Sequence, residues 1–395
     1  MKKKILFVIP NLGAGGAEKS LINLLNSFDF NTYEVDLLLT HKSGIFLEMV
    51  PKEVNILDVP KYYDIFSKQL FVALKRLLSS GRLDLFFYKT LFTINNRLQR
   101  NKLKAEQNNW KFVKYFFADI EKEYDTAIGY LEKTSNYIVI DCIKAKNKIG
   151  FIHNDYNAMG MSPKVDNYFF GKFKFIVTVS EECVLSLRKT FPQYEKKIKL
   201  IKNFIPKKYL YDLSKEQQQD GLLNRKYILS IGRLSEQKSF DKAIDAFKLL
   251  NSKHPGLEWI ILGEGNLRPQ LEKQIEKNGL EGKFWLLGNR INPYPFIKNC
   301  IVYVQTSIFE GKSIAIDEAK IFAKPIVVTN YPSAKDQIAD GETGLIAEMN
   351  PKDIADKIES LILDEQLRNI LSENLRKEEH CDESEIEKLY KLIES

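Results

Sequence analysis

Short apolar runs rich in β-branched residues alternate with segments of helical periodicity along most of this chain, and this alternation is the strongest constraint on its fold. Strands that alternate with helices are typical of parallel sheets covered by helices. The strand-like runs are residues 5–9, 35–39, 126–130, 148–152, 175–179, 227–231, 258–262, 283–287, 301–305 and 325–329. The sequence therefore predicts an α/β protein of two Rossmann-like α/β/α domains that face each other across a cleft, which is the natural ligand site.

A polar stretch, residues 206–226, separates the two halves. It has no β-branched residue, and a new strand signal begins directly after it. We interpret it as a linker between a first domain, residues 1–205, and a second domain, residues 227–381. Residues 382–395 have apolar side chains at helical spacing, so we expect a C-terminal helix that packs back toward the first domain. An insertion at about residues 60–117 lengthens the first domain.

The composition indicates an ordinary globular protein. No apolar run approaches the roughly 18 to 20 residues that cross a bilayer, so we expect the chain to be neither secreted nor membrane-spanning. The four cysteines lie far apart, without the spacing of a metal site, and we expect free thiols in a reducing cytoplasm. They are Cys142, Cys183, Cys300 and Cys381.

A glycine-rich turn follows the first strand. Gly15 and Gly16 precede an apolar helix pattern, and glycines let backbone amides approach an anionic ligand at a helix N-terminus. A dinucleotide-binding dehydrogenase would need glycine at Glu18 and an acid closing the second strand, where this chain has Thr40. The turn is therefore interpreted as an anion-binding loop, with a plain tight turn as the alternative.

The second domain opens with a strand, a glycine turn and two cations. Gly232 follows the strand, and Arg233 and Lys238 lie on the connection to the next helix. Arginine can bind a phosphate through two hydrogen bonds, lysine supplies a point charge, and ligands bind at the carboxyl edge of parallel sheets. We expect both cations to hold an anionic group; the alternative is that both are solvated surface residues.

Two glutamates flank a predicted helix start between the last two strand-like runs. Glu310 lies in the loop, and Gly311 or Ser313 can open the helix. At about 1.5 Å per residue, Glu318 lies some 7 to 8 Å along this helix, so the carboxylates flank its N-terminus without touching. Free amides there can receive a diphosphate, with hydroxyl groups on either side. Each glutamate taken alone could equally be a solvated carboxylate.

In this order, the motifs resemble those of the retaining glycosyltransferases of family 4, which have a GT-B fold and a Glu-x7-Glu motif in the C-terminal half. Glu310 and Glu318 have that spacing. The resemblance implies an acceptor domain in the first half and a nucleotide-sugar donor domain in the second. The resemblance extends over nearly the whole chain. The motifs that carry it are the first glycine loop and residues 152–155, 179–180, 202–206, 232–233, 238, 263–265, 310–318 and 340–345.

The resemblance also implies roles for single residues. Arg233 and Lys238 would hold the donor diphosphate. Glu318 would bind the ribose, and Glu310, a candidate catalytic residue, would position the donor sugar. His153, the second candidate catalytic residue, would face that sugar from the first domain as a positioning group. The other donor-binding candidates are Gly15, Gly16, Asn203, Gly232, Gly263, Gly311, Lys312, Ser313 and Ile314.

Two features bear on the chemistry. Lys312-Ser313 departs from the family pattern, where an apolar residue is often followed by proline or another small residue, and the extra cation fits donor binding. The chain has no Asp-x-Asp pair to hold a divalent ion, so we expect neither a metal nor another cofactor. Cations and helix dipoles would then stabilise the leaving diphosphate.

The insertion is basic and aromatic. Residues 61–115 carry twelve lysines or arginines and three acids among many Phe and Leu residues. Basic amphipathic helices suit an anionic membrane surface, and a self-contained helical subdomain is the alternative. No nucleic-acid partner is expected, because neither an aromatic platform nor a recognition helix is visible.

The sequence thus predicts retaining sugar transfer from a UDP-sugar, or less favoured a GDP-sugar, to a glycan or undecaprenyl-diphosphate-linked acceptor. The product would be a bacterial capsule, O-antigen or other surface polysaccharide, made at the inner face of the cell membrane. A UDP-sugar 2-epimerase of the same fold, which needs no acceptor, is one alternative. A catalytically silent membrane-associated partner is another.

Overall fold

The computed structural model of the chain describes residues 2–99, 101–118, 120–216, 221–378 and 384–395. It divides into two compact units. Unit 1 comprises Met1–Leu12, Leu25–Lys202 and Glu385–Ser395, and unit 2 comprises Gly13–Leu24 and Asn203–Ser384. Cys381 and the expected boundary between residues 227–381 and 382–395 lie outside the described residues.

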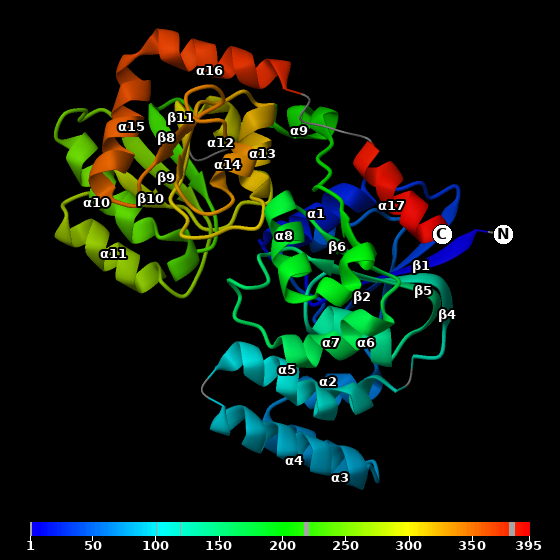
Figure 1. The fold of residues 1–395 in the computed structure, drawn as a ribbon. Coiled ribbons are helices and arrows are strands. Elements are labelled where there is room, and N and C mark those ends of the chain that lie inside the picture. The colour runs from blue at the N-terminus through cyan, green and yellow to red at the C-terminus, as the bar shows by residue number, and fades with distance from the viewer. Residues whose placement is uncertain (1, 100, 119, 217–220, 379–383) are drawn as a thin grey trace. The chain divides into compact units, whose positions relative to one another are not determined.

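Unit 1 is built on a seven-stranded parallel sheet with β1 near its centre (Figure 1). The crossovers run outward from β1 in both directions, as in Rossmann folds. The central strand is apolar throughout its second half, because both faces of a parallel sheet are covered. In spatial order the strands are β3 (Asn55–Leu57), β2 (Tyr33–Leu39), β1 (Lys3–Ile9), β4 (Glu123–Gly129), β5 (Lys144–Ile152), β6 (Phe175–Thr178) and β7 (Ile198–Leu200).

Helices from the insertion and from the strand connections complete unit 1. Connections between parallel strands need such crossovers, which is why each strand signal is followed by helical periodicity. The α-helices are α2 (Lys61–Ser67), α3 (Leu70–Ser79), α4 (Leu83–Leu98), α5 (Lys102–Val113), α6 (Thr134–Asp141), α7 (Pro163–Lys172), α8 (Glu181–Thr190) and α17 (Ser384–Glu394, whose first residue belongs to unit 2).

The insertion contributes to the core of unit 1. Phe66 of α2, Trp110 of α5 and Phe116 are buried in the same apolar cluster as Leu6 and Val8 of β1. The insertion is therefore not a separate subdomain with its own core. In Figure 1, α3 and α4 lie on the side of α2 and α5 that faces away from the sheet. No described helix is both long and apolar enough to span a membrane.

The C-terminal helix α17 packs in unit 1. Leu389 and Ile393 are buried, and the Oη atom of Tyr390 accepts a hydrogen bond of 2.8 Å from the backbone amide of Asp29. The side-chain amide of Asn147 in β5 donates to the carbonyl of Leu392 over 2.7 Å. Residues from the end of the chain thus stabilise the sheet that its beginning forms.

Unit 2 is built on a six-stranded parallel sheet with β8 and β11 at its centre. Two apolar layers cover its faces, one containing Phe247 and Ile358 and the other Ile316 and Tyr331. In spatial order the strands are β10 (Phe284–Leu286), β9 (Glu258–Leu262), β8 (Tyr227–Ile231), β11 (Val302–Gln305), β12 (Ile326–Thr329) and β13 (Leu345–Ala347). The prediction of two Rossmann-like α/β domains is confirmed by these two sheets.

The segment expected as a linker carries part of unit 2. Leu210 of α9 is fully buried, and the Tyr211 hydroxyl donates to the carbonyl of Ile321 over 2.8 Å. A short helix with one apolar face therefore packs where composition alone indicates only a polar connection. The helices of unit 2 are α1 (Gly16–Leu25, whose last residue belongs to unit 1), α9 (Lys207–Leu213), α10 (Phe240–Asn251), α11 (Arg268–Lys277), α12 (Tyr294–Asn299), α13 (Ile314–Ile321), α14 (Ala334–Gln337), α15 (Pro351–Leu363) and α16 (Glu365–Lys377).

Candidate active site

The loop after β8 is held against the loop after β9 by a close backbone approach. Gly263 has φ +156°, and a Cβ atom there would lie 1.9 Å from the carbonyl oxygen of Gly232. Only glycine fits this position. A Cβ at Gly232 would lie 2.8 Å from Cε of Lys238, so the lysine side chain runs across the second glycine. Gly263 is thus required for the close packing of the two loops, and Gly232 leaves room beside it for the Lys238 side chain.

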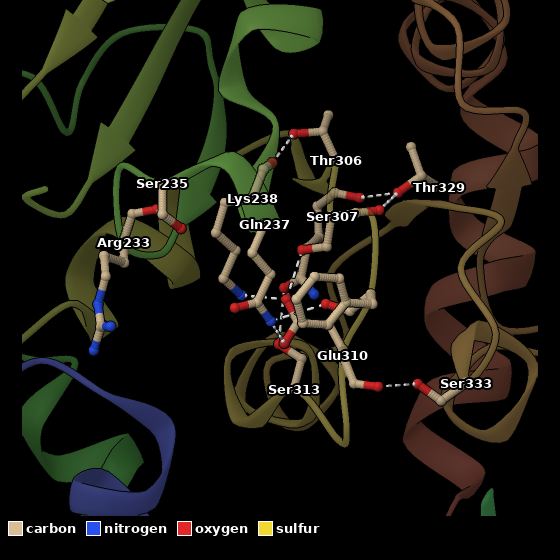
Figure 2. A network of polar contacts seen from close by, with 12 residues as sticks. Arg233, Ser235, Gln237, Lys238, Thr306, Ser307, Glu310, Ser313, Thr329 and Ser333 are labelled. Atoms are coloured by element: carbon tan, nitrogen blue, oxygen red, sulfur yellow. Dashed lines mark hydrogen bonds and ion pairs between the residues drawn. The ribbon is translucent and has the colours of Figure 1, made fainter. Parts of the chain in front are cut away.

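Lys238 and Glu310 form the centre of a polar network in unit 2 (Figure 2). The Nζ atom of Lys238 lies 2.6 Å from Oε1 of Glu310, and the Ser307 hydroxyl donates to the same oxygen over 2.6 Å. Gln237 donates through Nε2 to the carbonyl of Phe309 over 2.9 Å. The side chains of Lys238 and Glu310 are only 15% and 9% exposed, so the pair is largely shielded from water.

Further hydroxyl groups fix the loop backbone around this pair. Thr306 donates to the carbonyl of Lys238 over 2.8 Å, and Ser333 donates to the carbonyl of Glu310 over 2.8 Å. Thr329, at the end of β12, donates to the carbonyl of Ser307 over 2.6 Å. Three strands therefore position one carboxylate and one ammonium group. Figure 2 shows the exposed side chain of Arg233 pointing away from this network.

The N-terminus of α13 has no side-chain cap. Ser313 occupies the N-cap position, but its hydroxyl donates to Oε1 of Gln305 over 2.8 Å. The Ser313 amide donates to Oε1 of Gln337 over 2.8 Å. The first amides inside a helix, here beginning at Ile314, have no partner within the helix, and together with the helix dipole they favour an anion.

Lys312, which lies just before α13, forms an ion pair with a residue of that helix. Its Nζ atom lies 3.3 Å from Oδ2 of Asp317, and the two side chains are 17% and 14% exposed. The other oxygen of Asp317 accepts a hydrogen bond from Gln337 over 3.0 Å. Lys312 therefore stands beside the α13 N-terminus, next to Gly311, as half of an ion pair and not as an isolated cation.

Glu318 is fully buried on α13. It accepts a hydrogen bond of 2.8 Å from the hydroxyl of Tyr294, whose ring lies 4.9 Å from Nζ of Lys19 in α1. Burial raises the pKa of Glu318, while the Lys19 ammonium and the Tyr294 hydrogen bond partly offset that rise. Burial also lowers the pKa of Lys19. The carboxylate is thus hydrogen-bonded by Tyr294 and stabilised electrostatically by Lys19, both far from it in sequence.

The glycine-rich turn leads directly into α1. A Cβ atom at Gly15 would lie 2.1 Å from Oε2 of Glu18, so the Glu18 side chain lies against this glycine. Gly16 is the first residue of α1 and has open space around its Cα atom. Asn203 accepts a hydrogen bond of 2.8 Å from the hydroxyl of Ser20, which ties it to the same helix.

His153 lies in unit 1, directly after β5. Its backbone amide donates to Oε2 of Glu132 over 3.1 Å, and Asn154 donates to the other oxygen of Glu132 over 3.0 Å. The imidazole packs against the rings of Tyr130 and Phe151, and its buried Nε2 atom has no hydrogen-bond partner among the described residues. Burial lowers the pKa of His153 to about 4, so the ring is neutral near pH 7.

Unit 2 thus brings together Gly232, Lys238, Gly263, Glu310 and Ser313, while Arg233 points elsewhere and His153 belongs to unit 1. Sequence reasoning did not identify the residues that orient them. Ser307 could have been found, because it follows directly after a strand, where functional side chains often lie. Nothing in the local sequence marks the other orienting residues, which are Glu132, Gln237, Tyr294 and Gln337. Among the described residues, no group of three or more His, Cys, Asp or Glu side chains is placed to hold a metal ion.

Comparison with known proteins supplies independent information. Residues 214–378 match the family model described as "Glycosyl transferases group 1". The chain is also 27% identical over 376 residues to a Campylobacter jejuni protein, with 93% of this chain and 92% of the relative covered. That relative is named N-acetylgalactosamine-N,N'-diacetylbacillosaminyl-diphospho-undecaprenol 4-alpha-N-acetylgalactosaminyltransferase.

Two solved structures are similar over the whole chain. Anabaena HepE in complex with UDP-glucose has a TM-score of 0.72 and 17% identity, with 99% of each chain covered. A mutant of Staphylococcus aureus TarM in complex with UDP has a TM-score of 0.70 and 17% identity, with 100% of each chain covered. At this level of identity the likeness shows a shared fold, which is GT-B.

Proposed function

We propose that this chain, which has the GT-B fold, is a glycosyltransferase, and more closely a retaining enzyme of family 4 type that uses a UDP-sugar. The observation that carries this proposal is the Lys238–Glu310 pair beside the uncapped N-terminus of α13. A diphosphate needs cations and amide donors, and a sugar needs a carboxylate that accepts from its hydroxyls. HepE and TarM, which share this fold, were solved with UDP-glucose and UDP, and this supports UDP over GDP as the nucleotide.

The leaving diphosphate is the group that the site must stabilise. Lys238 supplies positive charge, and the α13 amides add the dipole of a helix N-terminus. Arg233 points away from the Lys238–Glu310 pair in this structure, so in this proposal its exposed side chain turns toward the diphosphate when the donor binds. In this proposal no metal ion takes part. The acceptor oxygen bonds to the anomeric carbon on the face from which the diphosphate leaves, the carbon–phosphate-oxygen bond breaks, and a phosphate oxygen takes the hydroxyl proton.

We assign the remaining donor contacts in this proposal to residues of unit 2. Glu310 accepts from hydroxyls of the donor sugar, and Glu318, which is hydrogen-bonded by Tyr294, accepts from the ribose. Gly232 and Gly263 keep the backbone close to the ligand. The other donor-binding candidates in this proposal are Gly15, Gly16, Asn203, Gly311, Lys312, Ser313 and Ile314.

His153 serves as a positioning residue for the donor sugar. Because burial lowers its pKa to about 4, its ring is neutral near pH 7 and is a hydrogen-bonding group of fixed orientation. Glu132 holds the backbone of His153 through its amide, and the rings of Tyr130 and Phe151 pack against the imidazole. The Nε2 atom has no hydrogen-bond partner in the part of the chain that the structure describes, and in this proposal it binds a sugar hydroxyl.

The acceptor we propose is a glycan or an undecaprenyl-diphosphate-linked saccharide, used in bacterial surface-polysaccharide synthesis at the inner face of the cell membrane. The Campylobacter relative, whose name specifies such a lipid-linked acceptor, supports this class.

The test is a panel of UDP- and GDP-sugars incubated with purified protein, with and without an undecaprenyl-diphosphate saccharide. We expect UDP release that depends on the acceptor and persists in EDTA. Loss of activity in EDTA would contradict metal independence, and GDP-sugar use would contradict the donor. Acceptor-independent UDP release with a 2-epimerised sugar would identify an epimerase instead, and no turnover with any donor would leave a silent partner protein.

A further inference from the structure

The outer sides of α3 and α4 leave large apolar side chains in solvent. Leu98 is 76% exposed and Phe71 is 85% exposed, values far from those of core residues. Isolated exposed apolar residues are normal on protein surfaces, whereas a contiguous group marks an interaction surface. The group, which we call the α3–α4 outer face, comprises Phe71, Val72, Leu78, Leu83, Phe87, Ile94 and Leu98.

The spacing along α4 makes these residues one stripe. Leu83, Phe87, Ile94 and Leu98 are separated by four, seven and four positions, so they project from the same side of the helix. The 16 residues of α4 extend the stripe over about 24 Å. The opposite side is also engaged, because Leu85 is buried in the core. The helix therefore has one apolar face for the core and a second that no described residue covers.

The charges around this face are predominantly positive. Residues 61–99 contain seven lysines or arginines and two aspartates. Both aspartates are already paired: Asp64 with Lys68 over 2.9 Å and Asp84 with Arg82 over 2.7 Å. Lys75, Arg76 and Arg97 are exposed and form no ion pair with any described residue. Apolar side chains flanked by uncompensated cations match the chemistry of an anionic lipid surface.

We infer that the α3–α4 outer face docks on an anionic lipid bilayer, with both helices lying in the plane of the interface. This inference deepens the proposed function and rests on it, because a lipid-linked acceptor is presented at that surface. A second copy of the chain fits less well, since a symmetric contact through this face would bring Lys75, Arg76 and Arg97 against the same cations of the partner.

The bound geometry follows from the two helices. Their apolar side chains enter the boundary between headgroups and acyl chains, about 5 to 10 Å deep, while the cations remain among the headgroup phosphates. α5 and α2 lie on the other side of α3 and α4, toward the sheet (Figure 1). The sheet of unit 1 is thereby held at a constant distance from the lipid surface.

The experiment measures binding of the full chain to vesicles of phosphatidylglycerol and phosphatidylcholine by sedimentation. The apolar variant replaces Phe71, Phe87 and Leu98 with Ser, and the charge variant replaces Lys75, Arg76 and Arg97 with Gln. We expect each to weaken binding about tenfold or more, since both apolar burial and headgroup attraction contribute. The wild type should bind pure phosphatidylcholine vesicles much less tightly, and added salt should weaken its binding to the anionic vesicles.

The control replaces three other apolar residues that are more than half exposed, Leu185, Leu363 and Ile370, with Ser. It should bind vesicles like the wild type. If the apolar triple variant misfolds by circular dichroism, Leu98→Ser alone is used, with an expected loss of about threefold. Unchanged binding in the apolar and charge variants, or absence of wild-type binding, would overturn the inference. Dimerisation of the wild type that the apolar variant abolishes, without vesicle binding, would assign the face to a second copy.

A separate readout distinguishes this inference from the proposed function. UDP affinity, measured by calorimetry in the absence of vesicles, should be the same in the wild type and in all three variants. Vesicle binding without sugar transfer to any acceptor would overturn the proposed function alone. Transfer to an acceptor in vesicles that survives unchanged in both test variants would overturn the docking inference alone.

Discussion

One carboxylate and one ammonium group dominate the site at the scale of single residues. The Nζ atom of Lys238 lies 2.6 Å from Oε1 of Glu310, and both side chains are mostly shielded from water. Charges this close in a partly buried site interact more strongly than exposed pairs do. In the proposed donor complex, the diphosphate would share Lys238 with Glu310 and would meet the negative charge of that carboxylate.

Glu310→Gln separates these two effects. Glutamine can still accept from Ser307, but it has no charge to hold Lys238 or to repel a diphosphate. We expect UDP affinity, measured by calorimetry, to rise about three- to tenfold, and sugar transfer to fall by at least about 100-fold. The control is Glu359→Gln, which removes the partner of Lys253 elsewhere in unit 2 and should change neither quantity. Weaker UDP binding in Glu310→Gln would contradict this account of the pair.

His153 makes the stability of unit 1 depend on pH. Burial lowers its pKa from 6.5 to about 4, so the unfolded chain binds a proton between these values that the folded protein does not. The stabilising contribution is complete above about pH 6.5 and is lost as the pH falls toward 4. The loss amounts to about 3 kcal/mol of unfolding free energy.

The measurement is chemical denaturation of the wild type and of His153→Gln at several pH values from 7.5 to 4.5. The difference in unfolding free energy between the two should shrink as the pH falls. Other titrating groups contribute equally to both proteins and cancel in the difference. A difference that stays constant over this range would show that His153 is not held neutral by burial.

At the scale of elements, the short helix α14 holds the residue at which α13 begins. Gln337 of α14 accepts from the amide of Ser313 and donates to its carbonyl, over 2.8 and 2.9 Å. Because Gln337 and Gln305 bind Ser313, the serine cannot cap the helix in the usual way. The first amides of α13 are thereby left for a ligand by contacts that come from two other elements.

The strands differ in how well the sequence predicts them. Strands such as β1 and β9 have apolar runs of at least four residues and were predicted close to their observed bounds. β3, β7 and β13 have only three residues each, too few for a recognisable period, and were missed, whereas β10, equally short, was predicted. α9 was missed because its single buried residue, Leu210, is surrounded by a polar segment.

At the scale of the whole molecule, the chain order and the structural units do not coincide. Unit 1 contains the beginning of the chain and also Glu385–Ser395, after the whole second sheet has been formed. Leu389 and Ile393 of α17 are buried in unit 1, and the hydroxyl of Thr126 in β4 donates to the carbonyl of Ile393 over 3.3 Å. Residues of α17 therefore help to stabilise the sheet of unit 1.

Two leucine substitutions test this arrangement. Leu389→Ala and Leu375→Ala each remove a fully buried side chain, at a cost of about 2 to 5 kcal/mol. Leu375 lies in the core of unit 2 and serves as the matched control. In hydrogen exchange, Leu389→Ala should weaken protection of β1 and β4, whereas Leu375→Ala should weaken protection of β8 and β11. Loss of protection in unit 2 from Leu389→Ala would contradict the placement of α17.

By itself, the sequence determined the two doubly wound sheets, the glycine turns and the spacing of Glu310 and Glu318. Those features depend on local periodicity and on short spacings, which neighbouring residues set. Only the tertiary structure decided that Lys238 pairs with Glu310, that Lys312 pairs with Asp317, and which apolar residues of the insertion are core and which face solvent. Such partners are brought together by packing and crossovers between separate elements, and no local pattern records which of several suitable residues will meet.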